Sequence, residues 1–369
     1  MKAVFKHLLM IVISAAAVSD SPAQTFSTLR AFTLRSGEAY TNSDGYNPVA
    51  ALYSSDNVLY GTTLEGGSAN SGSVFRIRND GTGFTNLHSF SALEYPVGTN
   101  GDGTRVSTDL VLSGGYLYGI ASFGGDFGGG TLLRLKTDGS GFTNLYHFGT
   151  PSTTNSAPGS AIVLSGNSLY GATPTGGDFG AGMLFRINLD GSGFTNLHSF
   201  SPPSSFQGLR TNADGIYPQD GVTLSGNALY GAASKGGPLG FGTVFRITTN
   251  GTEFSVLHAF SGWYDGDGDG PHGLLLSGNT LYGTTTAGGE FGNGTLFALG
   301  TGGNGFTNLH VFTSNFNNSF TNEDGASPNA RLILVTDTLY GTTFHAGPSG
   351  NGTVFSMSTN GNGFTTVHT

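Results

Sequence analysis

The chain has 369 residues, of which 63 are glycine; 10% are charged and 12% are aromatic. So many aromatic side chains exclude a disordered acidic chain, because they can bury the apolar surface that folding requires. The glycine content argues against a helical protein. The net charge of −9 makes binding to a nucleic-acid backbone unfavourable. The absence of cysteine excludes disulfides, thiolate metal sites and a cysteine nucleophile.

The N-terminus has the features of an export signal. Lys2 and Lys6 precede an apolar run at 8–18, and Ser21-Pro22-Ala23 resembles a cleavage site. This run is too short to cross a bilayer core of about 30 Å, and no apolar run of about 18 residues follows it. We therefore predict a signal peptide at 1–23, one folded domain at 24–369 and no transmembrane segment. The product would be exported, and so periplasmic, secreted or cell-surface associated.

After residue 25 the sequence consists of six copies of one unit. Each copy contains Leu-Tyr-Gly, usually followed by a Gly-Gly pair, then a β-like run and a final run such as FSVLHAF. The Leu-Tyr-Gly triplets lie at 59–61, 117–119, 169–171, 229–231, 281–283 and 339–341. Six copies at this spacing indicate one repeat architecture and not six independent domains.

Each unit contains four strand-like segments, which in the fourth copy are 222–226, 228–232, 243–247 and 254–260. All are short, rich in Val, Leu, Phe, Tyr and Thr, and bounded by Gly, Asn or Asp. Tight turns join the first to the second and the third to the fourth, which predicts a four-stranded antiparallel meander. We expect an all-β, six-bladed β-propeller. A β-solenoid is the alternative, although its coils use only about 20–30 residues.

The other two connections of each unit are long: the Gly-Gly segment and the linker to the next unit. In an up-and-down blade both leave on the same face, and long loops on a rigid scaffold are where binding usually occurs. Four linkers repeat Thr-Asn-x-Asp-Gly and supply the candidate ligand-binding residues Asp44, Asp102, Asp214 and Asp324. We expect these carboxylates to share one electronegative face. The alternative is that each caps its own turn.

The fifth linker instead carries Asp265, Asp267 and Asp269 at alternate positions. Three carboxylates can hold Ca²⁺ when backbone carbonyls and water complete the coordination shell. The loop is not an EF-hand, because Leu276 stands where that motif requires an acidic residue. The pattern predicts a weak calcium site, with a solvated acidic turn as the alternative. No haem, flavin, nucleotide or zinc site is evident.

Two further residue types recur. One position of the fourth strand holds His88, His198, His258, His310 and His368. Equivalent positions lie far apart in a ring, so we interpret these as packing or hydrogen-bonding residues; His272 and His345 lie outside the pattern and are the histidines to test for chemistry. Phenylalanines in or beside the Gly-Gly loops are Phe123, Phe127, Phe179, Phe241 and Phe291. They could stack on sugars, but we favour burial between blades.

The fourth-strand motif occurs seven times, although the other three segments occur six times. The extra copy, 26–32, precedes the first complete unit, and the last copy, 364–369, has no final phenylalanine. We expect residues 26–32 to close the ring by pairing within the sixth blade, either replacing 364–369 or lying outside them. Such pairing would remove an exposed strand edge.

The repeated units, for example DGIYPQDGVTLSGNALYGAASKGGPLGFGTVFRITTNGTEFSVLHAF (214–260), resemble the GloVer tandem repeat of surface proteins with assorted C-terminal anchors. More loosely, their order of motifs is similar to Kelch blades. Members of that family often end in an anchoring tail; because the last motif ends at Thr369, we expect none here. The resemblance supplies no catalytic residues.

Together these features predict an exported binding or interaction module directed at a glycan or another cell-surface component, such as a surface protein. The alternatives are an extracellular carbohydrate-active enzyme that uses carboxylates of the long-loop face, and a passive cell-envelope protein.

Overall fold

The structure is a computed structural model that describes residues 28–37, 41–48, 50–95, 98–149, 161–206, 208–262, 265–314 and 321–369. The predicted signal peptide lies outside these residues. All the regular elements of the described ranges are β-strands, which confirms the all-β prediction.

Six antiparallel sheets of four or five strands follow one another along the chain, one for each repeat. We call them blades 1 to 6. Blade 1 consists of β1 (Tyr53–Ser55), β2 (Val58–Thr63), β3 (Ser73–Arg78) and β4 (Thr85–Ser89). Blade 2 consists of β5 (Asn100–Val106), β6 (Val111–Ser113), β7 (Tyr116–Gly125), β8 (Thr131–Lys136) and β9 (Thr143–His147). Blade 3 consists of β10 (Val163–Ser165), β11 (Ser168–Thr173), β12 (Met183–Asn188) and β13 (Thr195–Ser199).

A small hairpin of β14 (Ser204–Phe206) and β15 (Leu209–Thr211) lies in the next linker. Blade 4 consists of β16 (Val222–Ser225), β17 (Ala228–Ala233), β18 (Thr243–Thr248) and β19 (Ser255–Ala259). Blade 5 consists of β20 (Asp269–Ser277), β21 (Thr280–Ala287), β22 (Thr295–Gly300) and β23 (Thr307–Val311). Blade 6 consists of β24 (Ala326–Pro328), β25 (Ile333–Val335), β26 (Thr338–His345), β27 (Val354–Ser358) and β28 (Thr365–His368). The strands of each blade pair in chain order, as a meander does, except that β5 and β6 both pair with β7 and β24 and β25 both pair with β26.

The glycine of Leu-Tyr-Gly makes room for a phenylalanine on the neighbouring strand. Gly231 pairs with Phe245 across β17 and β18, and a Cβ on Gly231 would lie only 2.4 Å from the ring. The ring therefore covers the glycine, as aromatic side chains do for glycines in other sheets. Blade 2 differs, because Leu133 stands opposite Gly119.

The hydrophobic core lies between the blades. Five buried clusters each contain residues of two consecutive blades, so every internal junction has its own core. The recurrent histidine of a fourth strand stacks on a phenylalanine of the next blade; His198 and Phe254, for example, have ring centroids 3.7 Å apart. This contact fits the interpretation of the repeated histidines as packing residues.

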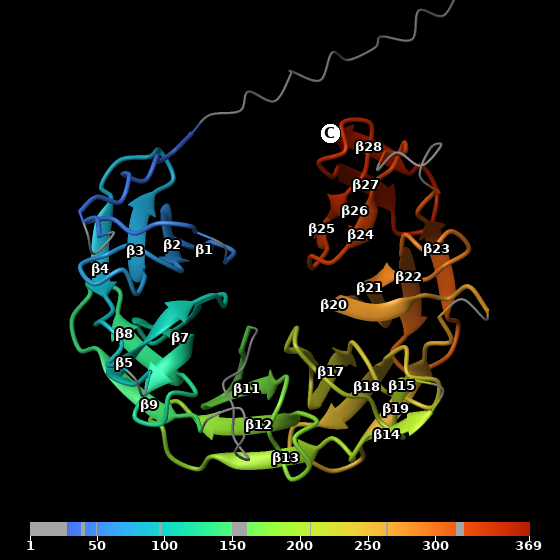
Figure 1. The fold of residues 1–369 in the computed structure, drawn as a ribbon, viewed down its shortest axis with the longest axis horizontal. Coiled ribbons are helices and arrows are strands. Elements are labelled where there is room, and N and C mark those ends of the chain that lie inside the picture. The colour runs from blue at the N-terminus through green and yellow to red at the C-terminus, as the bar shows by residue number, and fades with distance from the viewer. Residues whose placement is uncertain are drawn as a thin grey trace, which may run out of the picture.

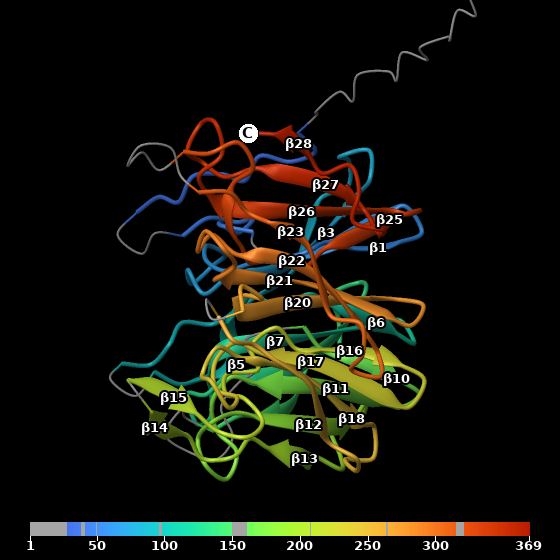
Figure 2. The ribbon, with the colours of Figure 1, turned by 90° about the vertical axis from the view of Figure 1, so that its right-hand side faces the viewer.

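The six blades form an arc around a central space, with the first strands inside and the fourth strands outside (Figure 1). Tight turns lie along one side of the arc and the long loops along the other (Figure 2). A gap separates blade 6 from blade 1 (Figure 1). Among the strand pairs of the described ranges, none joins blade 6 to residues 28–37 or to blade 1. The fold is thus propeller-like with six blades, and closure of the ring stays a prediction.

Candidate ligand-binding face

The asparagine of Thr-Asn-x-Asp-Gly ties each linker to a Gly-Gly loop. In the linker before blade 4, Asn212 Oδ1 accepts hydrogen bonds from the backbone N–H groups of Gly215 and Gly237, both at 2.9 Å. Its Nδ2 donates to the carbonyls of Ser201 and Gly215. The same bonds recur at Asn42, Asn100 and Asn322. In these four units the linker and the Gly-Gly loop therefore lie together on the same side, as the alternation of tight and long connections predicted.

The aspartate of the same motif binds the end of the preceding blade. Asp214 Oδ2 lies 2.9 Å from His198 Nε2, and the Ser201 N–H and hydroxyl both donate to this carboxylate. Asp102 has the same contacts with His88 and Ser91. Asp324 has them with His310 and Thr313.

In the first unit an arginine takes the place of the histidine. Arg30 Nη2 lies 2.5 Å from Asp44 Oδ2, and Thr33 donates to the same carboxylate through its N–H and its hydroxyl. The Arg30 guanidinium lies 4.3 Å above the ring of Phe84, where four other junctions stack a histidine and the junction of blades 2 and 3 stacks Tyr146. At the junctions where a linker aspartate is described, arginine and histidine fill this place alike, and both are flat N–H donors.

These contacts decide the ionisation of the linker aspartates. Burial by itself would raise the pKa of Asp214, but hydrogen bonds from His198 and Ser201 outweigh it and hold the pKa below its ordinary value. Burial also opposes ionisation of Asp44, where bonds from Thr33 and Arg30 lower the pKa. Asp102 and Asp324 behave as Asp214 does. Each carboxylate is therefore negatively charged at neutral pH.

The structure places the four predicted carboxylates at equivalent junctions on the long-loop side. Each joins its own linker to the preceding fourth-strand motif; they are Asp44, Asp102, Asp214 and Asp324. It does not bring them together, because each serves a different junction. Sequence reasoning missed their partners: the Asp–His contacts join different segments, and the Arg30 contact has no histidine to reveal it.

The fifth linker does not gather its three carboxylates. Asp267 is buried and bonded to His258 Nε2 at 2.9 Å and to the Ser261 hydroxyl at 2.8 Å, so it takes the place of the linker aspartate. Asp269 Oδ1 lies 2.8 Å from Lys235 Nζ, and Asp265 is exposed. In the part of the chain that the structure describes, no three His, Cys, Asp or Glu side chains are grouped to hold a metal. Calcium binding stays a prediction, and it would require Ca²⁺ to displace Lys235.

The phenylalanines of the Gly-Gly loops are mostly exposed. Phe123, Phe127, Phe179 and Phe291 are 45–59% exposed, and only Phe241 is buried. The expectation of burial between blades was therefore wrong for four of the five. Phe127, Phe179 and Phe291 occupy equivalent positions, two residues after the Gly-Gly pair, and each follows an exposed carboxylate, namely Asp126, Asp178 or Glu290.

The two histidines outside the repeat pattern have different surroundings. His272 Nδ1 lies 2.7 Å from Asp220 Oδ2, and the Gly273 N–H donates to the same oxygen. This contact fixes the orientation of the imidazole and leaves Nε2 as its other proton-exchanging atom. The His345 ring contacts the exposed Phe344. No serine, threonine or second carboxylate is hydrogen-bonded to His272 within the described ranges, so the pair is a dyad without a nucleophile.

Three solved structures are similar to this chain, and the first of them supports the propeller-like fold. The chain is similar to a GH74 enzyme from Niastella koreensis, with 17% identity and a TM-score of 0.51, over 89% of this chain and 46% of that one. It is also similar to a chain of a nidogen/laminin complex, with 13% identity and a TM-score of 0.45, over 85% of this chain and 93% of that one. A computationally designed protein, Ika8, matches at 12% identity and a TM-score of 0.44, over 87% of each chain.

No curated protein matches this sequence. Over the described ranges, no helix is long and apolar enough to span a bilayer. Two tandem matches to the Gloeobacter/Verrucomicrobia repeat, at residues 19–210 and 204–369, cover nearly the whole sequence and agree with the resemblance noted from its motifs. The chain belongs to the Gloeobacter/Verrucomicrobia repeat family.

Proposed function

We propose that this protein is an exported binding module whose long-loop face recognises a glycan. The observation that carries the proposal is the repeated pair of an exposed phenylalanine and a preceding carboxylate in the Gly-Gly loops of blades 2, 3 and 5. The same pair recurs at equivalent places on one side of the molecule, and this recurrence is the basis of the proposal. An aromatic ring offers a flat apolar face, and a carboxylate accepts hydrogen bonds from hydroxyl groups. A sugar ring has an apolar face that can stack on the phenylalanine and hydroxyl groups that can donate to the carboxylate.

The linker aspartates support this face in the proposal. Asp44, Asp102, Asp214 and Asp324 fix the linkers to the preceding segments, and the adjacent asparagines fix the linkers to the Gly-Gly loops. Of the three phenylalanines, Phe127 lies in a loop that is tied in this way, because the Gly125 N–H donates to Asn100. In the loop of Phe179, the Asp178 N–H donates to Ser199 of the same blade. Rigid presentation lowers the entropy that is lost when a ligand binds.

Repetition also makes the face multivalent. One phenylalanine–carboxylate pair belongs to each of three blades, so a polymeric ligand would contact several pairs at once. Linked weak contacts raise the overall affinity well above that of a single contact. We therefore expect oligosaccharides or polysaccharides to bind and monosaccharides to bind weakly.

Export and ring closure complete the proposal. Residues 1–23 carry the predicted export signal, so the mature protein would meet surface glycans outside the cytoplasm. We also propose that the arc closes into a six-bladed ring with residues 28–33 at the closing junction, which makes the long-loop face continuous.

A glycan array tests the proposal. Wild type is compared with the triple variant Phe127→Ala, Phe179→Ala, Phe291→Ala, and with the control Val335→Ala, which removes an exposed apolar side chain of β25. We expect the triple variant to lose at least about tenfold in affinity for any retained glycan, because it loses several linked contacts. The control should bind as wild type does. Unchanged binding of the triple variant, or an array with no retained glycan, contradicts the proposal.

A further inference from the structure

The two ends of the arc carry the faces that the internal junctions bury. At the junction of blades 1 and 2, Tyr60 and Val74 pack against Leu110 and Leu117. The residues equivalent to Leu110 are at most 4% exposed in blades 3 to 6, but their counterpart in blade 1, Leu52, is 48% exposed. Blade 1 therefore has an apolar face that nothing covers as fully as in the other blades.

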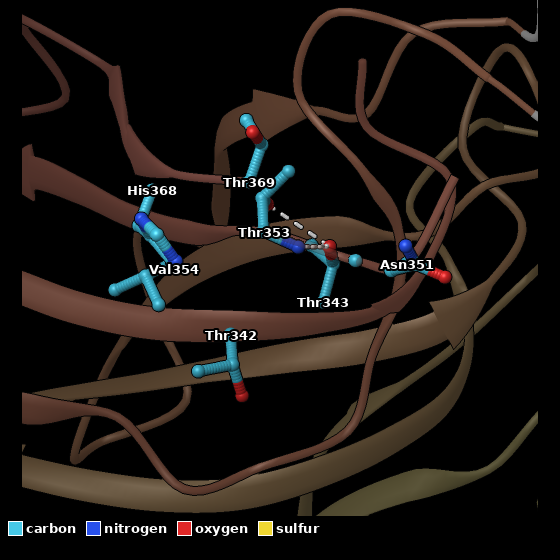
Figure 3. A pocket seen from close by; sticks show the side chains of 8 residues that line it. Thr342, Thr343, Asn351, Thr353, Val354, His368 and Thr369 are labelled. Carbon is cyan, nitrogen blue, oxygen red and sulfur yellow. Dashed lines mark hydrogen bonds between the residues drawn. The ribbon is translucent and has the colours of Figure 1, made fainter. Parts of the chain in front are cut away.

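Blade 6 has the complementary face. Tyr340 and Val354 are equivalent to Tyr60 and Val74, which are buried, yet both are only half-buried and Thr342 beside them is exposed. A cavity of about 220 Å³ is lined by Ile333, Tyr340 and Thr342. A second cavity, of about 340 Å³, lies between Thr342, Val354 and His368, as Figure 3 shows. Ile333 is 62% exposed, so this side of blade 6 exposes apolar side chains where the internal junctions bury theirs against the next blade.

Residues 28–33, which we call the N-terminal segment, lie on blade 1 where the fourth strand of a preceding blade would lie. The clearest sign is a turn glycine. A Cβ on Gly81 would lie 3.0 Å from the Leu29 carbonyl oxygen, as a Cβ on Gly139 would lie 2.8 Å from that of Leu87. The bonds of Arg30 and Thr33 to Asp44 repeat those made at the other junctions.

The packing of Phe32 repeats as well. Its ring meets Phe75 edge to face, with centroids 5.4 Å apart, as the ring of Phe200 meets Phe245 at 5.3 Å. The N-terminal segment thus makes contacts with blade 1 that correspond to those of a fourth strand with the following blade.

Strand β28 is the fourth strand of blade 6, and in a closed ring it would occupy the place that the N-terminal segment holds on blade 1. It pairs with β27 through Val354 opposite His368 and Phe355 opposite Thr366, the register that β4 adopts on β3. His368 and Arg30 are therefore equivalent residues. When blade 6 packs on blade 1 as the internal blades pack on each other, β28 and the N-terminal segment compete for one edge of β27 and for one carboxylate, that of Asp44.

We propose that blade 6 docks on blade 1 of the same chain, and that the N-terminal segment replaces β28 as the outermost strand of blade 6. The proposal rests on the closed ring proposed above and is independent of the glycan ligand. Asp44 decides the exchange, because its side chain is 3% exposed and a buried carboxylate that loses its partner is strongly destabilising. Val367 of β28 is 55% exposed, and His368 makes no ion pair among the described residues. On leaving, β28 would give up the bond of the Thr366 hydroxyl to the Glu323 carbonyl. Its backbone pairing with β27 would be replaced by that of the N-terminal segment.

The repeat register defines the new pairing. By equivalence with β4 on β3, the proposal would pair Arg30 with Val354 and Thr28 with Phe355, and the position before Thr28 with Ser356. The chain contains no cysteine, so a double cysteine variant has only the two introduced thiols. One variant is Ser27→Cys with Ser356→Cys. Its matched control is Thr365→Cys with Ser356→Cys, which joins β28 to β27 in the present pairing.

Both variants are oxidised as purified full-length protein, checked for folding by circular dichroism, and analysed by non-reducing electrophoresis and mass spectrometry. We expect a disulfide within one chain for 27–356 and at least about fivefold less of it for 356–365. Efficient crosslinking of 356–365 with none of 27–356 overturns the exchange. Disulfides that form only between chains show that a second copy is the occupant, and absence of both shows that the edge is empty; either result overturns the proposal.

Two single substitutions in the 27–356 background test the role of Asp44. Arg30→Ala should lower the crosslink yield several-fold, whereas the equivalent change in β28, His368→Ala, should leave it unchanged. The opposite pattern contradicts the proposal. The glycan array is run on the same samples, so a failure of closure and a failure of glycan binding are distinguished.

Discussion

At the scale of single residues, a few recurrent side chains make the same contacts in several repeats. Asparagine and aspartate of the linker motif have separate tasks: Asn212 joins the linker to a Gly-Gly loop, and Asp214 joins it to the preceding blade. The sequence revealed both positions by their recurrence. It could not reveal which partner each residue binds, because those partners come from segments that are distant in the sequence.

The glycine of Leu-Tyr-Gly gives the first prediction. Gly231→Ala should destabilise the fold by about 1–3 kcal/mol, because the added methyl meets the Phe245 ring at 2.4 Å and overpacks the sheet. Gly119→Ala is the matched control and should cost less, since its closest neighbour is the end of the Leu110 side chain at 2.8 Å. Urea unfolding of both variants measures the difference. Equal losses would show that the cross-strand ring is not what the glycine accommodates.

The linker aspartates give a pH dependence. Asp102, Asp214, Asp267 and Asp324 all have a pKa below the ordinary value in the folded protein. A lowered pKa contributes stability that is fully present above the unfolded pKa, about 3.9, and is lost as the pH falls through the folded pKa. We expect unfolding free energy to decline below about pH 4 and the Asp214→Asn variant to decline less steeply. A variant with the wild-type slope would contradict the assignment.

At the scale of elements, the strands were the most predictable part of the molecule. The segments expected in the fourth copy, 222–226 and 243–247, correspond to β16 and β18 within a residue at each end. Alternating apolar residues and tight Gly-Asn turns determine such strands locally. The exposure of Phe127 and Phe179 was not predictable, because a loop phenylalanine carries no periodic signal that says which way it points.

The junction between a fourth strand and the next linker gives the next prediction. His198→Ala removes the stack on Phe254 and leaves the buried Asp214 without one partner, so it should cost about 1–3 kcal/mol. His198→Arg should recover most of this loss, because Arg30 already fills the equivalent place beside Asp44 and Phe84. Thermal unfolding at neutral pH compares the two. An arginine variant no more stable than the alanine variant would refute the equivalence.

The acidic linker gives a prediction about calcium. Wild type should bind Ca²⁺ only weakly, with a dissociation constant of about 10⁻⁴ to 10⁻³ M. Lys235→Ala should strengthen binding, because it removes the ammonium group that lies 2.8 Å from Asp269. Isothermal calorimetry on the two proteins measures this. If neither protein releases or absorbs heat on addition of Ca²⁺, the loop is a solvated acidic turn.

At the scale of the whole molecule, the long-loop face determines which ligands are compatible. Phe127, Phe179 and Phe291 each follow a carboxylate, and the linkers add Asp265 and Glu323, which are exposed as well. Phe123 is the exception, because the Arg105 guanidinium lies 5.5 Å from its ring.

The motif count alone did not predict where the two chain ends lie, because seven fourth-strand motifs fit six blades in more than one way. The structure adds the contacts of Arg30 and Phe32 with blade 1, and these specify which end competes for the junction.

The negative charge of the exposed carboxylates predicts whether neutral or anionic glycans bind to the long-loop face. Fixed carboxylates beside the phenylalanines repel uronic acids and sulfated sugars, whereas neutral sugars carry no charge that they could repel. We expect neutral oligosaccharides to bind with little dependence on salt. Anionic ones should bind weakly at low ionic strength and improve as salt screens the repulsion over about 10 Å at 0.1 M. Replacing Asp126, Asp178 and Glu290 by the corresponding amides should admit the anionic ligands and preserve the neutral ones. An array run at two salt concentrations checks both statements, and a wild-type preference for anionic glycans that weakens with salt would mean that a different surface binds them.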